Sequence, residues 1–275
     1  MFNPPQKPWP YQKINAGHPL AHGLVSCLAI NEGAGNTIID LVPKLLLTKT
    51  GTSNWVITEG GLAIDQAAGA NYYSRNVDSG LVNLTTSFTI EAIFIPDIDL
   101  PAGEYQCLIQ AGSATNNRIG LWLYNQSIIL VSGSGFYTAV PNSTNAGVLS
   151  HIVYTHSDTE DLAYFNGVYV GGDNLVNPVS LGGTLHIGYS IIQSGYGADG
   201  KHILYRIWNR TLNPAEVLQL YRKPYAMFEP VFNEVLFGYV AAGGGWTGKI
   251  CGVDSTDIAK IMGVAIADIA KVCGV

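Results

Sequence analysis

The sequence has few charged side chains, no excess of positive charge and no long apolar run, and each shortage excludes a class of protein. Charged residues make up 12% of the 275 residues, which suits strands joined by tight turns better than long surface helices. The formal net charge of −6 provides no general attraction to nucleic acid or to anionic membranes. Because no run of 18 apolar residues occurs, we do not expect a transmembrane span.

Cysteine is scarce as well, and its positions do not suggest a disulfide framework. Cys27 and Cys107 lie inside apolar, strand-like runs, as small core residues do. Cys251 and Cys273 lie near the C-terminus and have no zinc-ligand spacing with any histidine. The N-terminal stretch MFNPPQKPWPYQKINAGHP lacks the continuous apolar segment of a signal peptide. We therefore expect the protein to be made and folded in a cytoplasm.

Residues 184–208 predict two strands around a glycine-rich loop. Leu185 and Ile187 alternate with polar or small residues, the pattern of a half-buried strand. The loop at 194–200 is rich in glycine, and we expect it to turn in the open. In the strand that follows, we expect one face formed by Ile203, Tyr205 and Ile207, and another formed by Leu204, Arg206 and Trp208.

The next segment carries the signals of a short helix from about 214 to 222. Asn213 is a good N-cap, Pro214 suits the first helical position, and Glu216 can close a capping box. The side chains expected to face the body of the domain are Val217, Leu218 and Tyr221.

Short strand patterns recur through the rest of the region 18–224. Segment 87–95 is apolar on both faces, so we expect a central strand that is covered on both sides. Roughly twelve short strands at close spacing predict an all-β fold, an antiparallel β-sandwich of two sheets with one short helix. The other segments with strand character are 23–30, 55–58, 61–66, 71–77, 105–112, 118–125, 127–133 and 150–172.

Several of these segments resemble, in the same order, parts of the laminin-G-like, concanavalin A-like jelly rolls. The matching closing segments are HIGY (186–189), GADGKHILYRIWNRTL (197–212) and NPAEV (213–217). YFNGVYV resembles the family's Tyr-x-Asp-Gly-x-x-Val hairpin, with Asn166 in place of the usual Asp, and Asn-Gly is itself a strong turn signal. The resemblance implies a jelly roll but leaves function open, because the fold serves lectins, glycosidases and passive structural modules.

The carboxylates and histidines do not form a catalytic pattern. Retaining glycosidases of this fold carry close carboxylates on one strand, in a Glu-x-Asp-x-x-Glu-like motif, and Glu91 stands alone in its strand. His151 and His156 lie five residues apart in one strand and therefore point to opposite faces, which argues against a shared metal site. Glu32 and Asp40 match positions of the family's opening segment, or they only shape turns. We expect a protein that is not an enzyme.

Two loops are candidates for a carbohydrate site, and the alternative is that both are ordinary solvated turns. Lectins use loop Asp, Asn and Gly residues beside an exposed aromatic ring, in some cases over a bound calcium ion. Calcium is thus a candidate cofactor, although the sequence identifies no ligand set for a metal. The candidate glycan-binding residues are Tyr196, Asp199, Lys201, Asn116 and Asn117.

The two ends of the chain differ from the domain. Residues 1–17 predict an extended arm, either disordered or laid along a neighbour. Residues 225–248 form a connector with a glycine linker at 243–245, and 249–275 repeat a Lys-Ile-Cys-Gly-Val-like segment every eleven residues. Because glycine in each repeat disfavours one continuous helix, the repeat predicts a helical segment of two short helices at about 254–262 and 265–273.

Such a small helical hairpin cannot bury its apolar face alone. We therefore expect the repeat to be an assembly element that docks on copies of itself, as a trimer, or on another protein. The alternative is that it folds back onto its own sandwich. The residues that carry most of its apolar surface are Ile250, Val253, Ile258, Ile261, Val264, Ile269, Val272 and Val275.

The segment 221–228, which ends in Pro-Tyr-Ala-Met-Phe, resembles the stretch found directly after such domains in tailed-phage virion proteins. The sequence therefore predicts a non-enzymatic structural or adhesion protein of a virus particle, in the head decoration, tail or fibre, made in the host cytoplasm and located in the virion. The alternative is a free carbohydrate-binding lectin with a glycan site in its loops. Expected partners are other virion proteins, copies of itself and a host cell-surface glycan, with no nucleic acid and no membrane.

Overall fold

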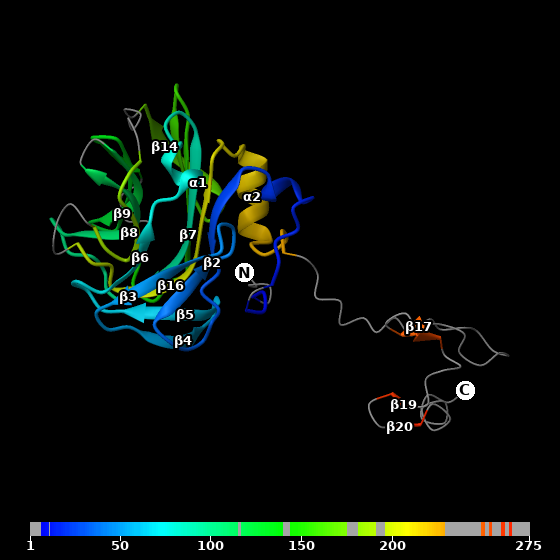
Figure 1. The fold of residues 1–275 in the computed structure, drawn as a ribbon. Coiled ribbons are helices and arrows are strands. Elements are labelled where there is room, and N and C mark those ends of the chain that lie inside the picture. Colours follow the sequence, from blue (N-terminus) through cyan, green and yellow to red (C-terminus); the bar gives the residue numbers. More distant parts are fainter. Residues whose placement is uncertain are drawn as a thin grey trace. The chain divides into compact units, whose positions relative to one another are not determined.

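The computed structural model describes residues 7–10, 12–114, 117–139, 144–174, 181–190 and 196–228, together with four two-residue strands between 249 and 265. The chain divides into two units, residues 1–229 and 230–275. Figure 1 shows the strands of the first unit stacked in two layers.

The first layer, named here the β7 sheet, runs through the centre of the domain. Its strands are β1 (Leu24–Leu28), β4 (Asn54–Thr58), β5 (Gly61–Gln66), β7 (Phe88–Pro96), β12 (Ser150–His156), β13 (Asp161–Phe165), β14 (Val168–Asp173) and β16 (Gly200–Trp208). Their order is β14-β13-β12-β7-β16-β5-β4, and β1 also pairs with β16. β5 and β1 therefore share one edge of β16.

The second layer, named here the β8 sheet, is also antiparallel. Its strands are β2 (Thr37–Asp40), β3 (Leu45–Thr50), β6 (Tyr72–Asn76), β8 (Tyr105–Ala114), β9 (Asn117–Tyr124), β10 (Ser127–Ser132), β11 (Gly135–Ala139) and β15 (Thr184–Ile187). Their order is β11-β10-β9-β8-β15-β6-β3-β2. The prediction of an all-β, two-sheet antiparallel sandwich is confirmed.

Apolar side chains fill the space between the two sheets and also cover their outer faces. Every residue of β7 is buried, which confirms the expected central strand. Phe88, Ile90 and Phe94 join the core between the sheets, whereas Ile93 and Ile95 join a cluster on the outer face of the β7 sheet. Cys27 and Cys107 are buried and unbridged, as predicted for small core residues.

Three short helical segments accompany the sheets within the described residues. They are the 3-10 turn η1 (Pro19–Ala21) and the helices α1 (Ser79–Val82) and α2 (Pro214–Arg222). The predicted start of α2 is confirmed: Asn213 Oδ1 accepts from the backbone N–H of Ala215 and Glu216, and Glu216 Oε2 accepts from Asn213 N. The helix buries Val217 as expected, but its second buried residue is Leu220, while Leu218 and Tyr221 are half-buried.

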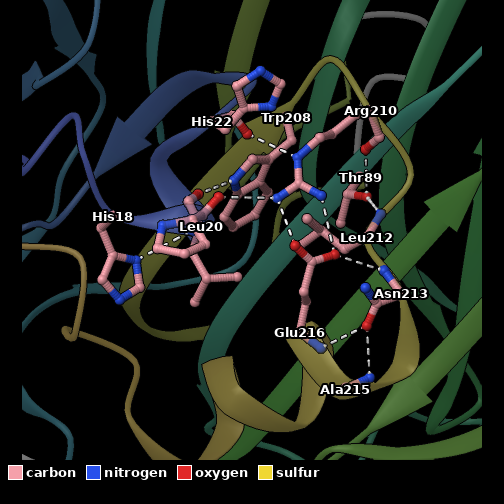
Figure 2. A network of polar contacts seen from close by, with 11 residues as sticks. His18, Leu20, His22, Thr89, Trp208, Arg210, Leu212, Asn213, Ala215 and Glu216 are labelled. Atoms are coloured by element: carbon pink, nitrogen blue, oxygen red, sulfur yellow. Dashed lines mark hydrogen bonds and ion pairs between the residues drawn. The ribbon is translucent and has the colours of Figure 1, made fainter.

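The start of α2 is tied to η1 and to the end of β16 (Figure 2). Arg210 donates to both carboxylate oxygens of Glu216, at 3.0 and 2.8 Å, and to the carbonyl of His22 at 2.8 Å. Trp208 Nε1 donates to the carbonyl of Leu20 at 2.7 Å. These bonds place α2 and the N-terminal segment together on the outer face of the β7 sheet.

A bulge in β16 changes the predicted faces of that strand. The register with β7 shifts between His202 and Leu204, so Ile203 joins Leu204 and Trp208 in the outer cluster and only Tyr205 and Ile207 remain in the inner core. The strict alternation predicted for 203–208 is wrong at Ile203. The bulge inserts an extra residue into β16, so the side chains before it point to the opposite face from the one that simple alternation predicts.

The loop before β16 is also different from the open turn that was expected. Gly197 forms a bridge with Cys107, and Ala198 N donates to the carbonyl of Gly188 at 2.9 Å. Gly197, Ala198 and Gly200 are buried, so the described part of the loop packs against the β8 sheet.

In the second unit, the predicted helices are wrong at the positions that the structure describes. β17 (Lys249–Ile250) pairs with β18 (Val253–Asp254), and β19 (Lys260–Ile261) pairs with β20 (Val264–Ala265). Two residues separate the strands of each pair and the second is glycine, a composition typical of hairpin turns, and the flanking Ile and Val favour strands. The assembly candidates Ile258, Ile269, Val272 and Val275 lie outside the described residues.

Candidate functional site

The structure separates the sequence-predicted glycan residues into three places. Tyr196 packs on the outer face of the β8 sheet. Asp199 and Lys201 lie where β16 begins, with Lys201 opposite Asp65 of β5. Asn117 pairs with Ala114 at the β8–β9 hairpin, far along β8 from the strand start that Tyr196 contacts. Asn116 lies outside the described residues.

Tyr196 completes a tyrosine cluster, defined here as Tyr105, Tyr124 and Tyr196. The ring of Tyr105 lies 4.3 Å from that of Tyr124 and 5.0 Å from that of Tyr196, in tilted and stacked arrangements. Trp122 lies beneath them, with its ring 5.9 Å from that of Tyr196 and nearly perpendicular to it. The tyrosines are half-buried while Trp122 is buried, so the cluster is an aromatic surface on an apolar base.

The strand register explains how distant residues form this cluster. Tyr105 of β8 lies opposite Tyr124 of β9, and Cys107 lies opposite Trp122, so all four share the outer face of the sheet. The hydroxyls of Tyr124 and Tyr196 lie near that of Tyr105, and burial together with these neighbours raises the pKa of Tyr105. The Tyr105 hydroxyl therefore stays protonated at neutral pH and can donate as well as accept hydrogen bonds.

Glycine at position 120 gives the Trp122 indole its place. A Cβ on Gly120 would lie 3.2 Å from Trp122 Nε1 and 2.7 Å from the carbonyl oxygen of Ile109. The missing side chain thus lets the indole lie over Gly120 of its own strand, β9. Arg118 Cζ, also from β9, lies 5.4 Å from the centre of the indole ring.

A polar pair continues the same face beyond the tryptophan. Gln110 of β8 lies opposite both Gly120 of β9 and His186 of β15. Both side chains are buried, and within the described part of the chain Gln110 Nε2 and His186 Nδ1 have no hydrogen-bond partner. His186 Nε2 bonds Thr184 Oγ1 at 2.7 Å, and burial lowers the pKa of His186 to about 4, so the ring is neutral at neutral pH.

A second group of polar side chains, the aspartate cluster, lies at the other candidate position. It comprises Asp65, Asp97, Asp199 and Lys201. Lys201 forms an ion pair with Asp97, and Asp97 N donates to the Asp199 carbonyl at 3.1 Å. Burial raises the pKa of Asp65 and the charge of Asp97 adds to this, while Lys201 lowers it; burial and Asp97 likewise raise the pKa of Asp199.

The aspartate cluster does not have the geometry of a retaining glycosidase. Asp65 and Asp97 share a side-chain hydrogen bond, which holds their oxygens closer than the separation of about 5–5.5 Å that those enzymes use. Glu91 is fully buried and accepts from Arg206 and His151. These carboxylates are therefore engaged in structural contacts.

Two further acids, Asp40 and Glu32, also have structural roles. Asp40 is buried and accepts from Ser26 Oγ at 2.6 Å, from Cys27 N at 2.8 Å and from Arg75 Nη2 at 2.9 Å. Glu32 accepts from Ile39 N at 2.8 Å. Both shape the β1–β2 connection, in agreement with the simpler alternative.

Neither a metal centre nor a membrane-spanning helix is found among the residues that the structure describes. Those residues contain no group of three or more His, Cys, Asp or Glu side chains placed to hold a metal ion. Calcium stays a prediction without a ligand set. No helix in the described ranges is both long and apolar enough to cross a bilayer.

Sequence reasoning named Tyr196 as a candidate but did not name the residues around it. Trp122 and Tyr124 alternate in one strand, which places both on one face, and this signal could have marked β9 as an aromatic surface. No local signal shows that Tyr105 and the loop of Tyr196 meet it, because that contact depends on the pairing of strands far apart in the chain.

Comparison with known proteins gives both a family match and similar folds. The model of the concanavalin A-like lectin/glucanases superfamily matches residues 68–218. No curated protein sequence matches the chain. Domain 4 of AbnA, an extracellular arabinanase from Geobacillus stearothermophilus in complex with arabinotriose, is 18% identical with a TM-score of 0.57, over 72% of this chain and 98% of that one.

Two further solved structures come from longer chains. The binding domain of Paraclostridial Mosquitocidal Protein 1 is 17% identical with a TM-score of 0.61, over 74% of this chain and 52% of that one. Trypanosoma rangeli sialidase in complex with the inhibitor DANA is 15% identical with a TM-score of 0.56, over 75% of this chain and 34% of that one. The chain thus spans about a third of the sialidase, and these likenesses show the fold alone.

Proposed function

The chain belongs to the concanavalin A-like lectin/glucanases superfamily, and from that premise we propose that it is a non-catalytic carbohydrate-binding protein. The binding surface is the tyrosine cluster of Tyr105, Tyr124 and Tyr196. The observation that carries the proposal is the half-buried aromatic surface over Trp122, beside the buried polar atoms of Gln110 and His186.

The cluster matches the chemistry that a sugar presents to a protein. A pyranose ring has an apolar face of C–H groups and a rim of hydroxyls. The tyrosine rings offer an apolar surface of comparable size, and their hydroxyls offer donors and acceptors at its edge. Pockets for small ligands typically combine such an apolar lining with a few convergent polar groups.

The proposal excludes catalysis on this surface. Hydrolysis of a glycosidic bond needs an acid and a nucleophile or base next to the sugar, and the acids described above lie elsewhere. Asp65 and Asp97 share a hydrogen bond in the aspartate cluster, and Glu91 is buried with Arg206 on the outer face of the other sheet. The binding part of the proposal is supported by the arabinanase domain 4, a domain of similar fold that was solved in complex with arabinotriose.

A glycan array probed with the full chain, followed by calorimetry with the best glycan, tests the proposal. Tyr196→Ala removes one ring of the cluster and should weaken binding about tenfold, or about 1.4 kcal/mol. Tyr169→Ala is the matched control, because Tyr169 is an exposed tyrosine on β14 of the other sheet. Asp199→Ala should leave affinity unchanged, since its carboxylate belongs to the aspartate cluster.

Three results would contradict the proposal. The first is an array without any glycan bound at micromolar protein. The second is equal loss of affinity in the Tyr196 and Tyr169 variants. The third is loss on Asp199→Ala with full affinity in Tyr196→Ala, which would move the site to the start of β16.

The place of action proposed for this binding protein is a virus particle, as a head decoration, tail or fibre component. This proposal is supported by the resemblance of segment 221–228 to tailed-phage proteins. Association with copies of itself through the repeat at 249–275 belongs to the same proposal. Mass spectrometry of purified particles tests the location, and absence of the chain from them would leave the free lectin as the remaining candidate.

A further inference from the structure

The amino group of Lys7 is buried in the first unit and is held by backbone carbonyls. Its three N–H groups are shared among four carbonyl oxygens, those of Ala29 at 2.8 Å, Ile30 at 3.0 Å, Ile203 at 2.7 Å and Leu62. The rest of the residue stays partly exposed. We name these four acceptors the carbonyl cage.

The carbonyl cage lies at a gap in the β7 sheet. β5 pairs with β16 up to the contact of Ile64 with His202, and β1 pairs with β16 only from Tyr205 onward. Ile203 therefore lies between two partners of the same edge, at the bulge in β16. Neither partner pairs with Ile203 in its register, and the Lys7 ammonium donates to the Ile203 carbonyl instead.

The backbone around the gap is shaped to admit a lysine side chain. Ile30 adopts a φ of 50°, a left-handed conformation that is unusual for a β-branched residue, and this turns the chain at the end of β1. Gly61 has a φ of 94°, and a Cβ there would lie 3.0 Å from Lys7 Cδ and 3.1 Å from Cγ. Glycine at this position makes room for the aliphatic part of the lysine.

No carboxylate is among the hydrogen-bond partners of Lys7 in the described residues. Glu32 is the nearby acid, and its oxygens accept from Asn31 N at 3.0 Å and from Ile39 N at 2.8 Å. Burial lowers the pKa of Lys7 to about 7, and Glu32 acts in the opposite direction. Burying this charge is costly, and backbone dipoles together with the charge of Glu32 offset that cost.

Lys7 begins a segment that also holds the end of the first unit. We name residues 7–10 and 12–17 the N-terminal strap. Asn31 Nδ2 donates to the Pro8 carbonyl at 2.8 Å, and at the other end of the strap Asn15 N donates to the Met227 carbonyl at 2.8 Å, beside a bridge between Ile14 and Phe228. Figure 1 shows this N-terminal segment, in dark blue, beside the gold helix α2.

We propose that the carbonyl cage is a binding site for a primary ammonium group, and that Lys7, by filling it, latches the N-terminal strap onto Met227 and Phe228. The site selects a primary ammonium for two reasons. The ligand nitrogen must carry several N–H groups to donate to the surrounding carbonyls, and the space beside Gly61 admits an unbranched alkyl chain. Opening the latch frees both the strap and the last described residues of the first unit. The glycan surface on the other sheet is not involved.

The first test is hydrogen exchange in the full chain. Lys7→Met keeps the length and the apolar stem but removes the ammonium, and we expect roughly tenfold or faster exchange at 12–17 and 225–228. Lys13→Met, in the exposed part of the same strap, is the matched control and should leave exchange unchanged. Equal exchange in the wild type and in Lys7→Met would overturn the latch.

The second test uses small amines. In Lys7→Ala, n-butylammonium should raise the melting temperature, whereas tetramethylammonium, which has no N–H, should not. In the unaltered protein, n-butylammonium should compete with Lys7 and speed exchange of the strap, so the test does not depend on a variant that folds. If both amines act alike, or neither acts, the carbonyl cage is not an ammonium site.

Discussion

Changing Glu91 to Gln is expected to cost the sandwich about 3–5 kcal/mol, because it leaves a buried guanidinium without its counter-charge. Glu91 and Arg206 lie opposite each other on β7 and β16, and neither is exposed. Glu91 accepts from Arg206 Nε at 2.5 Å and from Nη2 at 2.8 Å, and its Oε1 lies 2.9 Å from His151 Nε2.

The magnitude depends on the contacts that Arg206 loses and those that it keeps. A hydrogen bond to a charged partner contributes about 1.5–3 kcal/mol, and the substitution weakens two of them. Arg206 keeps the Pro224 carbonyl at 2.6 Å and Met227 Sδ at 3.5 Å, both uncharged. The double change Glu91→Leu/Arg206→Met removes both charges and should recover most of the loss, since apolar replacement of a buried pair is commonly neutral or stabilising.

The pH dependence has a definite sign. Burial raises the pKa of Glu91, but the charge of Arg206 and the hydrogen bonds from His151 and Arg206 oppose it, and the net shift is downward. A carboxyl with a lowered folded pKa contributes stability above its unfolded pKa and loses it as the pH falls through the folded value. The difference in free energy of unfolding between the wild type and Glu91→Gln should therefore shrink as the pH falls through the folded pKa of Glu91.

Urea denaturation followed by tryptophan fluorescence measures these free energies of unfolding. The buried Trp208 lies beside the pair, with its ring centre 5.5 Å from Arg206 Cζ. Lys201→Met is the control, because it breaks a partly exposed ion pair with Asp97 in the same sheet and should cost less than about 1 kcal/mol. If Glu91→Gln costs no more than this control, or if the double variant is less stable than the single one, the reasoning is refuted.

Three further predictions concern α2, a turn and a buried ring. Asn213→Ala removes the N-cap of α2 and should cost about 1 kcal/mol in urea denaturation, with no loss if the cap is dispensable. Gly167→Ala should lower the free energy of unfolding more than Gly147→Ala does. Both glycines have positive φ, 77° and 72°, but only a Cβ at position 167 would lie 2.9 Å from Tyr221. Equal losses in the two variants would rule out the clash. Burial lowers the pKa of His202 to about 3, so the unfolded state binds a proton below about pH 6.5 that the folded state rejects. Stability should fall with decreasing pH by up to about 1.4 kcal/mol per pH unit, and His202→Phe should have a flatter profile between pH 7 and 5.

Local signals in the sequence predicted the elements that depend on a few neighbouring residues. The start of α2 follows from Asn213, Pro214 and Glu216, whose side chains bond within the same turn. The β13–β14 hairpin follows from Asn166 and Gly167, which adopt φ values of 50° and 77°, the left-handed pair that a tight hairpin turn requires.

Features that depend on distant segments could not be predicted in the same way. The bulge at Ile203 lies where β5 and β1 divide the opposite edge of β16, and no property of residues 200–208 alone reveals this. The repeat at 249–275 contained a usable signal, because a glycine stands two residues after Ile250, Ile261 and Val272. Its eleven-residue period, however, fitted helices equally well. Its assembly role stays a prediction.

The same separation limits prediction of the candidate site. Tyr196 was identifiable as an aromatic residue in a glycine-rich loop, whereas its neighbours come from β8 and β9. Lys7 was part of a segment without periodicity, and the carbonyls that hold it belong to three separate segments. Backbone acceptors leave no mark in the sequence, because every residue carries a carbonyl.

The two buried cysteines can report how often the protein around each of them opens. Burial raises the pKa of Cys27 to about 12 and that of Cys107 well above its ordinary value, so neither thiol reacts with an alkylating reagent until the protein over it moves aside. Cys27 lies in the cluster that α2 and Phe228 cover, and Cys107 lies beneath the tyrosine cluster. With Cys251 and Cys273 replaced by serine, the two alkylation rates time the opening of the two outer faces separately, within one molecule and without an added label.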